Sequence, residues 1–456
     1  MRNRPPRAAP VRSVESPAIS RRRLFGAGAL AASTLTVAGC STPLAAGLLG
    51  TQLDPEVIVY WNLFGGGDGV RMQDMETAYR EEYGESSLQA TTLTWGNPYY
   101  SKLTLATVGN QPPDVAVAHL TRAKPLWTGG ILDPITEKDL AGVGLTTEDF
   151  NAQAWKAQVT DGQNIAIPLD THPFTLFYNK EVCDQAGLLD ADGLLVDLTG
   201  MDAFEAALAE ISAVTEGLAI TVANVAETST PWRFFWTLYN QLDAATPFLE
   251  DDGATISVDE ESFLEVMGRI QSWVDQGWLN SALDYATSQT TMFTGGSGFY
   301  LQGEWEISTA QSIDGLEFGM APIPQLYDRQ AVQADSHTFI LPRKDRSPEQ
   351  RQQAMEFIKA MLEQSFTWAE GGHVPSYMPA FESAEYQALE PQKYYAASAD
   401  YAVYDDPAWY GGSGSTFEST VGAQLGLVQQ GVLTPEQALQ AIRAQLEIYT
   451  STPSPL

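Results

Sequence analysis

The pattern of apolar and polar positions predicts strands that alternate with helices along most of the chain. The run from Val57 to Trp61 is short and apolar, as in a buried strand. A glycine-rich loop follows at 64–69, and apolar residues then recur at helical spacing from Met72 to Tyr83. This segment therefore predicts a strand, a glycine loop and a helix, in that order.

Later segments repeat the strand pattern, and two later helices carry clear start signals. The further predicted strands are 114–118, 165–169, 175–178, 298–301 and 338–341. Helices are expected to begin at Pro348 and Pro435, because each proline follows a capping hydroxyl and precedes a glutamine at the third helical position. Strands that alternate with helices indicate a parallel α/β architecture, in which ligands bind outside the carboxyl ends of the strands.

The first forty residues have the pattern of an export signal. Seven arginines and one acidic residue precede Leu24, an apolar run extends from there to Val37, and small residues lead to Cys40. A membrane anchor is the alternative. The apolar run has only fourteen residues, and several of them are Gly, Ala, Ser or Thr, so it is shorter than the roughly 20 apolar residues that a spanning helix needs. We therefore predict a signal peptide over residues 1–39.

Two finer features of this segment concern the export route and the anchor. Arg22-Arg23-Leu24-Phe25 resembles the core of a twin-arginine motif, which favours export in a folded state and leaves general secretion open. Val37-Ala38-Gly39-Cys40 resembles a lipobox, which implies that Cys40 becomes the lipidated first residue of the mature protein. Residues 40–53 would then form a tether, because they are mostly small and carry little pattern.

Charge, cysteine content and length limit the possible partners and the architecture. Without residues 1–39 the chain keeps 18 basic and 56 acidic residues, a formal charge of −38. Such a field repels phosphate backbones and anionic headgroups, which argues against nucleic acid or a membrane surface as partner. Cys183 is the only cysteine besides Cys40, so no intrachain disulfide is expected. The chain is longer than one core usually supports, so we expect two domains.

Histidines, glycines and acidic residues form no specific catalytic or metal-binding motif. His119, His172, His337 and His373 are scattered without close metal-ligand spacing, which favours hydrogen-bonding roles and leaves a distributed zinc site open. The loop at 65–69 lacks the spacing and the lysine of a phosphate loop, and either an ordinary turn or a ligand-contacting loop fits it. No nucleophile elbow or metalloprotease helix occurs. We therefore predict no catalytic residue, no cofactor and no resident metal.

Aromatic residues mixed with polar ones stand out in the predicted loops. The clusters are Trp61-Asn62-Leu63-Phe64, Trp95-Gly96-Asn97-Pro98-Tyr99-Tyr100, Trp232-Arg233-Phe234-Phe235-Trp236 and Trp409-Tyr410. Sugars need this mixture, because their C–H faces dock on aromatic rings while their hydroxyls require planar donors and acceptors. Core packing is the alternative for any single tryptophan, but the clusters together predict a binding surface.

The order of several short motifs resembles that of the extracellular solute-binding proteins of ATP-driven importers, specifically their carbohydrate-binding, maltose-binding-protein-like group. The motifs are Val57-Ile58-Val59-Tyr60-Trp61, Gln111-Pro112-Pro113-Asp114-Val115, Ala166-Ile167-Pro168-Leu169-Asp170, Leu176-Phe177-Tyr178-Asn179-Lys180, Gly303-Glu304-Trp305, Phe318-Gly319-Met320-Ala321-Pro322-Ile323-Pro324 and Gly372-His373-Val374-Pro375-Ser376. Each motif is weak alone, but the series spans essentially the whole mature chain behind a lipobox.

This resemblance implies an α/β, two-lobed periplasmic-binding-protein-like fold with a ligand cleft between the lobes. One lobe would comprise 54–168 plus 337–378, and the other 169–336 plus 379–450. The implied ligand-binding residues are Phe64, Asp68, His119, Arg122, Asp170, His172, Trp232, Trp236, Glu304, Trp305 and Trp409, with Trp95, Asn97, His373 and Tyr377 at the rim or wall.

The resemblance also implies binding without chemistry. Acidic residues would accept hydroxyl hydrogens, Arg122 and the histidines would donate, and tryptophans would stack on sugar rings. It implies a carbohydrate ligand and the permease subunits of an ABC importer as partners, for a monomeric, lipid-anchored protein on the outer face of the cell membrane. The particular sugar does not transfer, because the loop at 65–67 offers no basic residue where maltose-binding protein has one.

Two alternatives to carbohydrate import stay open. One is a binding protein for another small polar solute, such as a phosphorylated polyol. The other is a secreted carbohydrate-active enzyme that uses paired carboxylates, although so many acidic residues make any chosen pair unspecific.

Overall fold

The computed structural model describes residues 57–226 and 228–454. All described residues belong to one compact unit. The predicted signal peptide, Cys40 and the tether lie outside the described residues. Within the described part of the chain, no helix is long and apolar enough to span a membrane.

The first sheet contains six strands in the order β2-β1-β3-β15-β4, with β7 paired to β15. Their bounds are β1 (Ile58–Asn62), β2 (Leu88–Thr92), β3 (Val115–His119), β4 (Leu132–Asp133), β7 (Ile167–Pro168) and β15 (His337–Pro342). β1 runs parallel to β2 and β3, whereas β15 runs antiparallel to β3, β4 and β7. Every residue of β1, β3 and β15 is buried, which fits the continuous apolar runs that predicted these strands.

The second sheet contains seven strands in the order β17-β14-β8-β12-β9, and β13 and β16 also pair with β8. Their bounds are β8 (Asp170–Asn179), β9 (Ile220–Thr221), β12 (Phe299–Gly303), β13 (Phe318–Pro322), β14 (Val332–Asp335), β16 (Val374–Pro375) and β17 (Ala402–Val403). β8 runs antiparallel to β12, β13, β14 and β16. Two short hairpins join β5 (Val159–Thr160) to β6 (Gln163–Asn164) and β10 (Leu249–Glu250) to β11 (Thr255–Ile256).

Both sheets are mixed, so the prediction of a parallel architecture is wrong. A parallel pair needs a long crossover, usually a helix, between its strands. Here a single residue, Leu169, separates β7 from β8, and Ser336 alone separates β14 from β15. These short links carry the chain straight from one sheet into the other, and β8 and β15 then pair antiparallel with strands from distant parts of the chain.

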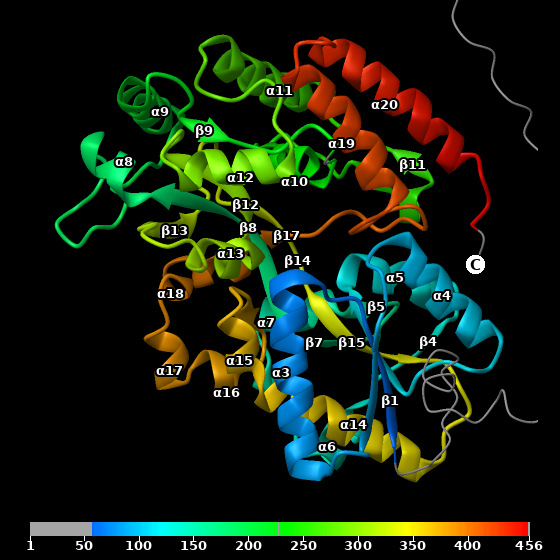
Figure 1. Cartoon of the computed structure of the whole chain (residues 1–456). Coiled ribbons are helices and arrows are strands. Elements are labelled where there is room, and N and C mark those ends of the chain that lie inside the picture. Colours follow the sequence, from blue (N-terminus) through cyan, green and yellow to red (C-terminus); the bar gives the residue numbers. More distant parts are fainter. Residues whose placement is uncertain (1–56, 227, 455–456) are drawn as a thin grey trace, which may run out of the picture. The chain divides into compact units, whose positions relative to one another are not determined.

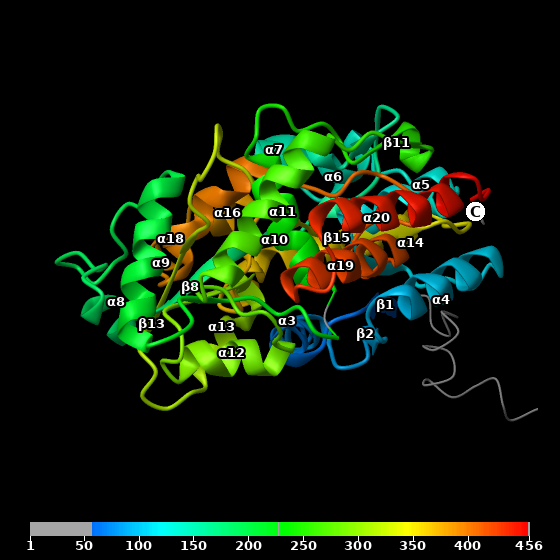
Figure 2. The same cartoon turned by 90° about the horizontal axis from the view of Figure 1, so that it is seen from above.

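Helices surround both sheets (Figure 1). They are α3 (Gly66–Tyr83), α4 (Asn97–Val108), α5 (Leu120–Thr128), α6 (Glu137–Gly142), α7 (Ala152–Ala157), α8 (Lys180–Gln185), α9 (Met201–Thr215), α10 (Ser229–Asn240), α11 (Glu260–Asp275), α12 (Tyr285–Phe293), α13 (Ile307–Gln311), α14 (Pro348–Glu363), α15 (Ser365–Ala369), α16 (Met378–Phe381), α17 (Ala384–Gln387), α18 (Gln392–Tyr395), α19 (Thr416–Gln429) and α20 (Pro435–Thr450), with short 3-10 turns η1 (Thr147–Asp149), η2 (Asp251–Gly253), η3 (Glu304–Glu306) and η4 (Ala396–Tyr401). Figure 2 shows α10, α11, α19 and α20 side by side, and α10 also contacts β8 and β14.

The two predicted helix starts are confirmed. Ser347 and Thr434 each accept a hydrogen bond from the third residue of the helix, and the glutamine at that position closes a capping box. The apolar stripes of α14 and α20 are buried, including Phe357 and Ile442. Each helix is thus held by a local cap and by a packed face.

Each sheet has its own hydrophobic core. The core of the first sheet draws on 58–169 and 339–368, and the cores on either side of β8 draw on 174–332 and on residues from 369 onward. The lobe boundaries given above stay a prediction. The strand membership of the two sheets agrees with them except at β16, which pairs with β8 of the second sheet although 337–378 was assigned to the first lobe.

The chain passes between the sheets at three points, and these points touch one another. The amide of Leu169 donates to the carbonyl of His337 at 2.8 Å, and the amide of Ser376 donates to the carbonyl of Leu169 at 3.1 Å. The third passage runs from Trp368, in the first core, to Val374, which pairs with Thr171 of β8. Side chains at the three passages are therefore forced into one small volume.

Candidate functional site

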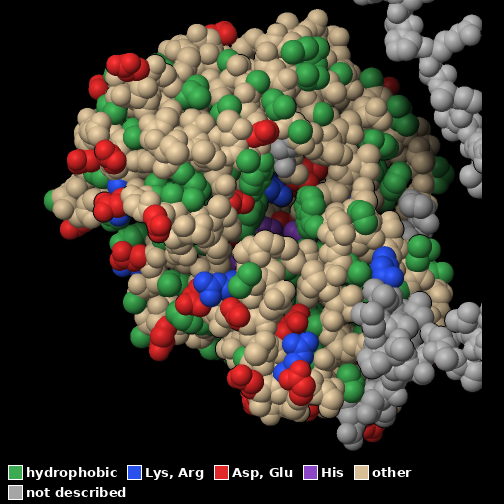
Figure 3. All heavy atoms as spheres, in the orientation of Figure 1, with side chains coloured by type: hydrophobic (Ala, Val, Ile, Leu, Met, Phe, Trp, Pro, Cys, Tyr) green, Lys and Arg blue, Asp and Glu red, His purple; other side chains and the backbone are tan. Residues whose placement is uncertain are grey.

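A pocket of about 260 Å³ is lined by strand ends, helices and loops that belong to both sheets. Its lining residues are Leu63, Phe64, Gly65, Asp68, Trp95, His119, His172, Ser229, Arg233, Tyr285, Trp305, His337 and Ser413. Figure 3 shows histidine side chains and a basic side chain inside a hollow near the centre of this face. The pocket combines aromatic, basic, acidic and uncharged polar groups from both sheets.

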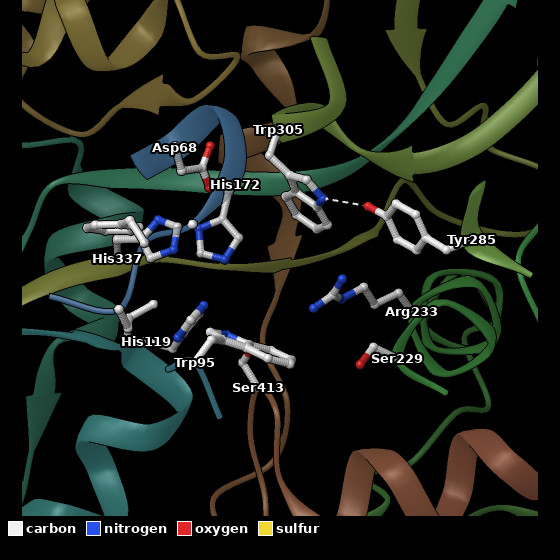
Figure 4. A pocket seen from close by; sticks show the side chains of 13 residues that line it. Asp68, Trp95, His119, His172, Ser229, Arg233, Tyr285, Trp305, His337 and Ser413 are labelled. Carbon is white, nitrogen blue, oxygen red and sulfur yellow. Dashed lines mark hydrogen bonds between the residues drawn. The ribbon is translucent and has the colours of Figure 1, made fainter. Parts of the chain in front are cut away.

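Two tryptophans stand on opposite sides of this pocket (Figure 4). Trp305, in η3, donates its indole N–H to the hydroxyl of Tyr285 at 3.1 Å. The guanidinium of Arg233 lies over the Trp305 ring at 4.9 Å from its centroid. Gly303 makes room for this ring, because a Cβ there would lie 2.0 Å from the indole. Trp95, in the turn before α4, is 42% exposed and free to contact a ligand.

The floor of the pocket is built from histidines. The ring centroids of His172 and His337 are 4.1 Å apart, and that of His119 lies 4.7 Å from His337 and 5.5 Å from His172. The ring of His373 lies behind them, 5.4 Å from His337. The chain has four histidines, and the fold brings all of them together.

The carboxylate of Asp170 organises this floor. Its Oδ1 lies 3.1 Å from Nδ1 of His172, and its Oδ2 lies 2.7 Å from Nδ1 of His337. Burial alone would raise the pKa of Asp170, but His337 and His172 outweigh it and hold that pKa well below its ordinary value. An ionised carboxylate only accepts, so both imidazoles donate from Nδ1 and present Nε2 elsewhere.

Two of the pocket histidines, His119 and His172, are neutral at physiological pH. Burial, followed by the neighbouring His337, lowers the pKa of His172 to about 3. Burial and the same neighbour lower the pKa of His119 well below its ordinary value. Nδ1 of His119 lies 3.0 Å from the hydroxyl of Tyr100. These two imidazoles therefore offer uncharged donors and acceptors to a ligand.

Behind the floor, His373 lies among three carboxylates. Its Nε2 is 3.1 Å from Oδ1 of Asp68, and its Nδ1 is 3.1 Å from Oδ2 of Asp170 and 3.0 Å from Oε1 of Glu304. Burial would lower the pKa of His373, but Asp68 and Asp170 outweigh it and raise that pKa well above its ordinary value. Burial raises the pKa of Glu304 to about 7.

The backbone before His373 fits closely against Glu304. Gly372 has a φ of 111°, and a Cβ there would lie 2.4 Å from the carbonyl oxygen of Glu304. Trp368 stacks on the His373 ring at 4.2 Å between centroids and donates its indole N–H to Asp170 at 2.7 Å. Glycine and tryptophan together fix the position of the imidazole.

Nine of the predicted site residues meet in this region. Phe64, Asp68, Trp95, His119, His172 and Trp305 line the pocket, and Asp170, Glu304 and His373 lie directly behind its floor. Asn97 and Arg122 lie beside it and bond to each other at 3.0 Å, and Arg122 also donates to the carbonyl of Ser413 at 3.4 Å.

Four predicted site residues lie elsewhere. Trp232 and Trp236 belong to helix α10, not to a loop, and are buried in the second core, where their rings stack at 4.9 Å. Aromatic residues four apart on a helix share one face, and here that face is the core face. Trp409 packs on Tyr410 and Tyr449, and Tyr377 packs on Phe150.

Five polar or charged lining residues were not predicted. They are Ser229, Arg233, Tyr285, His337 and Ser413. Arg233 carried a signal, because it is the one charged residue among the aromatic residues of its segment and points away from their core face. His337 was noted only as a histidine, and its place beside Asp170 depends on the contact between two passages of the chain.

A ligand-sized pocket between two mixed sheets linked by three passages defines a two-lobed binding protein. A family model described as bacterial extracellular solute-binding protein matches residues 78–399. The chain therefore belongs to the bacterial extracellular solute-binding proteins, as its motifs predicted. No curated protein sequence matches the chain.

Solved structures share this fold at low sequence identity. The sugar-binding protein MalE from Xanthomonas citri has 15% identity and a TM-score of 0.70, with 87% of this chain and 97% of that chain covered. The GacH receptor of Streptomyces glaucescens, solved with acarbose, has 17% identity and a TM-score of 0.68 over 86% and 98%. UgpB from Mycobacterium tuberculosis, solved with glycerophosphocholine, has 16% identity and a TM-score of 0.69 over 85% and 97%.

Proposed function

We propose that this protein captures a small carbohydrate outside the cell and delivers it to the permease of an ABC importer. The observation that carries this proposal is the pair Trp95 and Trp305, which face a pocket floored by histidines. Sugar rings present C–H faces to aromatic side chains and hydroxyls to polar ones. The pocket supplies both kinds of contact from opposite sides.

Pocket size favours a ligand of one or two rings. Its volume of about 260 Å³ lies just below the range of about 300–1,000 Å³ that small-molecule sites occupy. A long oligosaccharide would have to extend beyond the described walls. We therefore expect mono- and disaccharides to bind more tightly, per ring, than longer chains.

Polar groups of the pocket suit hydroxyls better than a fully charged ligand. Asp68 accepts hydrogen bonds, and Arg233 donates them. Arg233 also lies 3.5 Å from Glu418, which balances part of its charge. The neutral imidazoles of His119 and His172 can donate or accept according to the nitrogen that bears the proton.

A phosphorylated polyol is the second candidate ligand. Arg233, at the pocket wall, favours it, because guanidinium groups bind phosphate oxygens in pairs. UgpB, a structural relative, was solved with a phosphodiester. Two other structural relatives support the sugar, since MalE is a sugar-binding protein and GacH was solved with acarbose.

The arrangement of carboxylates supports binding without catalysis. Asp170 and Glu304 are both fully buried, and both face His373. A glycosidase needs its two carboxylates on opposite sides of the scissile bond, about 5 to 9.5 Å apart, with the substrate between them. An imidazole fills the space between these two.

The N-terminal pattern supports a lipid anchor at Cys40 on the outer face of the cell membrane. One acyl chain binds a bilayer only marginally, so diacylation at that residue would be needed for stable anchoring. Residues 40–53 would let a monomeric binding protein move close to its permease.

Isothermal titration calorimetry of the mature protein with a panel of sugars tests the proposal. The panel should contain monosaccharides, disaccharides, longer maltodextrins and a glycerophosphodiester. Saturable heat with a small sugar is the expected result. No heat with any sugar, together with binding of the phosphodiester, would replace the sugar by the second candidate. Release of reducing sugar from polysaccharide would contradict a purely binding role.

A further inference from the structure

Behind the pocket floor, four buried side chains place metal-binding atoms close together. They are Asp170, His172, His337 and His373, and one donor atom from each lies within 4.8 Å of all the others. Each of the four is at most 5% exposed. Asp170 and His172 come from β8, His337 begins β15, and His373 precedes β16. The donors therefore come from all three passages between the sheets.

Two residues of this region have buried polar atoms without a proper partner. Within the described residues, neither side-chain oxygen of Glu304 nor Nδ1 of His373 makes a well-directed hydrogen bond. The two groups nevertheless lie 3.0 Å apart, and Nδ1 also lies 3.1 Å from Asp170. Buried polar atoms are nearly always paired, so atoms that converge without bonding indicate a missing ligand among them.

The charge balance of the region is consistent with a cation, because two buried carboxylates face the imidazole of His373, which would release its proton when a metal ion binds. Asp170 and Glu304 are both fully buried. No lysine or arginine in the described part of the chain forms an ion pair with either carboxylate. Buried charges are normally paired or bound to a metal, because an isolated charge costs much free energy away from water.

We propose that Asp170, His172, His337 and His373 bind a divalent transition-metal ion of the zinc class, with Glu304 as an adjacent neutralising carboxylate. Three imidazoles and one carboxylate are the donors that Zn²⁺ prefers, whereas Mg²⁺ and Ca²⁺ prefer oxygen atoms alone. Four protein donors that exclude water make a structural site and not a catalytic one. The ion lies behind the ligand pocket, which stays free for a solute.

Such an ion joins the three passages of the chain at one point. It also sets the hydrogen-bonding character of the pocket floor. An ion on Nδ1 of His172 and of His337 leaves the proton on Nε2, so the floor donates hydrogen bonds. Without the ion, Asp170 holds the protons on Nδ1 and the Nε2 atoms accept. Ligand binding should therefore differ between the two forms.

Metal titrations of the mature protein test the site directly. The protein is stripped with a chelator, dialysed, and titrated with ZnCl₂ by calorimetry and with CoCl₂ by visible absorption. We expect one equivalent of either ion to bind, and bound Zn²⁺ to raise the thermal unfolding temperature. The proposal would be overturned if the folded wild-type protein bound Zn²⁺ with a dissociation constant above about 1 mM, or at several unequal sites. This test does not depend on any variant.

Two histidine variants locate the site. H373Q should weaken Zn²⁺ binding at least tenfold, because it removes a donor that does not line the pocket. H119Q is the matched control, because His119 contacts Tyr100 and is absent from the four-residue group, and its Zn²⁺ affinity should match that of the wild type. Circular dichroism checks that both variants fold. Equal Zn²⁺ affinity in H373Q and wild type, or loss of affinity in H119Q alone, would overturn the assignment.

Discussion

Oδ2 of Asp170 lies 2.7 Å from Nδ1 of His337. Asp170 begins β8, where the chain enters the second sheet, and His337 begins β15, where the chain returns to the first. The amide of His337 donates to the other oxygen of the same carboxylate, also at 2.7 Å. One side chain thus holds two passages together. Because His337 and His172 also line the ligand pocket, the contact that joins the sheets shapes the pocket floor.

The D170N variant should destabilise the fold by about 3–5 kcal/mol, because removing one partner of a buried charged network leaves the others unpaired. Urea unfolding followed by circular dichroism, in the presence of a chelator, measures the change. D192N is the control, since Asp192 is exposed, and it should stay within about 0.5 kcal/mol of the wild type. Equal stabilities for D170N and D192N would show that the hydrogen bonds to Asp170 contribute little.

Trp305 should carry much of the ligand affinity. W305A removes an aromatic wall of the pocket, and we expect affinity to fall by more than tenfold, about 1.4 kcal/mol. Quenching of tryptophan fluorescence or calorimetry with the tightest ligand measures it. W409A is the control, because Trp409 packs on Tyr410 and Tyr449 outside this pocket. If the ligand had the same affinity for W305A as for the wild type, the role of Trp305 in ligand binding would be contradicted.

The close contact at Gly372 predicts a strong effect of a single methyl group. G372A places a Cβ 2.4 Å from the carbonyl oxygen of Glu304 at a φ of 111°, so we expect a loss of more than about 2 kcal/mol of stability. Gly193 also has a positive φ. Apart from its chain neighbours, no described residue has a heavy atom within 4 Å of the position that a Cβ would take there. G193A should therefore cost only about 1 kcal/mol. Thermal unfolding compares the two, and a larger loss in G193A would contradict the contact.

Asp139 should contribute its full stabilisation above about pH 4 and lose it as the pH falls to about 2. Burial alone would raise the pKa of Asp139, but hydrogen bonds from Arg351 and Thr136 outweigh it and lower that pKa to about 2. A depressed pKa gives stability that is complete above the unfolded value near 4 and is lost as the pH falls toward about 2. D139N should lower stability at pH 5 by about 1 kcal/mol.

The same variant should also flatten the change in stability between about pH 4 and about pH 2. Nε of Arg351 lies 2.7 Å from Oδ1 of Asp139, so R351Q should flatten the same interval. Denaturant unfolding at several pH values measures both variants. If the unfolding free energy of D139N changed with pH across this interval as steeply as that of the wild type, the role of the pair would be contradicted.

The local structure of this protein could largely be predicted from its sequence. The apolar run at 57–61 and the strand at 114–118 appear within a residue of their predicted bounds as β1 and β3. The caps at Ser347 and Thr434 mark the starts of α14 and α20. These features depend on contacts between near neighbours in the chain, which the order of residues records directly.

The sequence misled where a residue's role depended on which face of an element met the core. Trp232 and Trp236 have the composition of a sugar site, yet their spacing on α10 turns them into the core and leaves Arg233 at the pocket. The direction of the strands also escaped prediction, because it depends on which distant strands pair within each sheet. Neither feature follows from local composition.

By itself, the sequence determined the strands, the capped helices and the family, because these depend on short motifs and near neighbours. Only the tertiary structure decided the site. His119, His172, His337 and His373 carry no spacing signal, and they meet because three separate passages between the sheets touch at Asp170. Contacts between distant segments depend on how the sheets pack, and no local pattern encodes that packing.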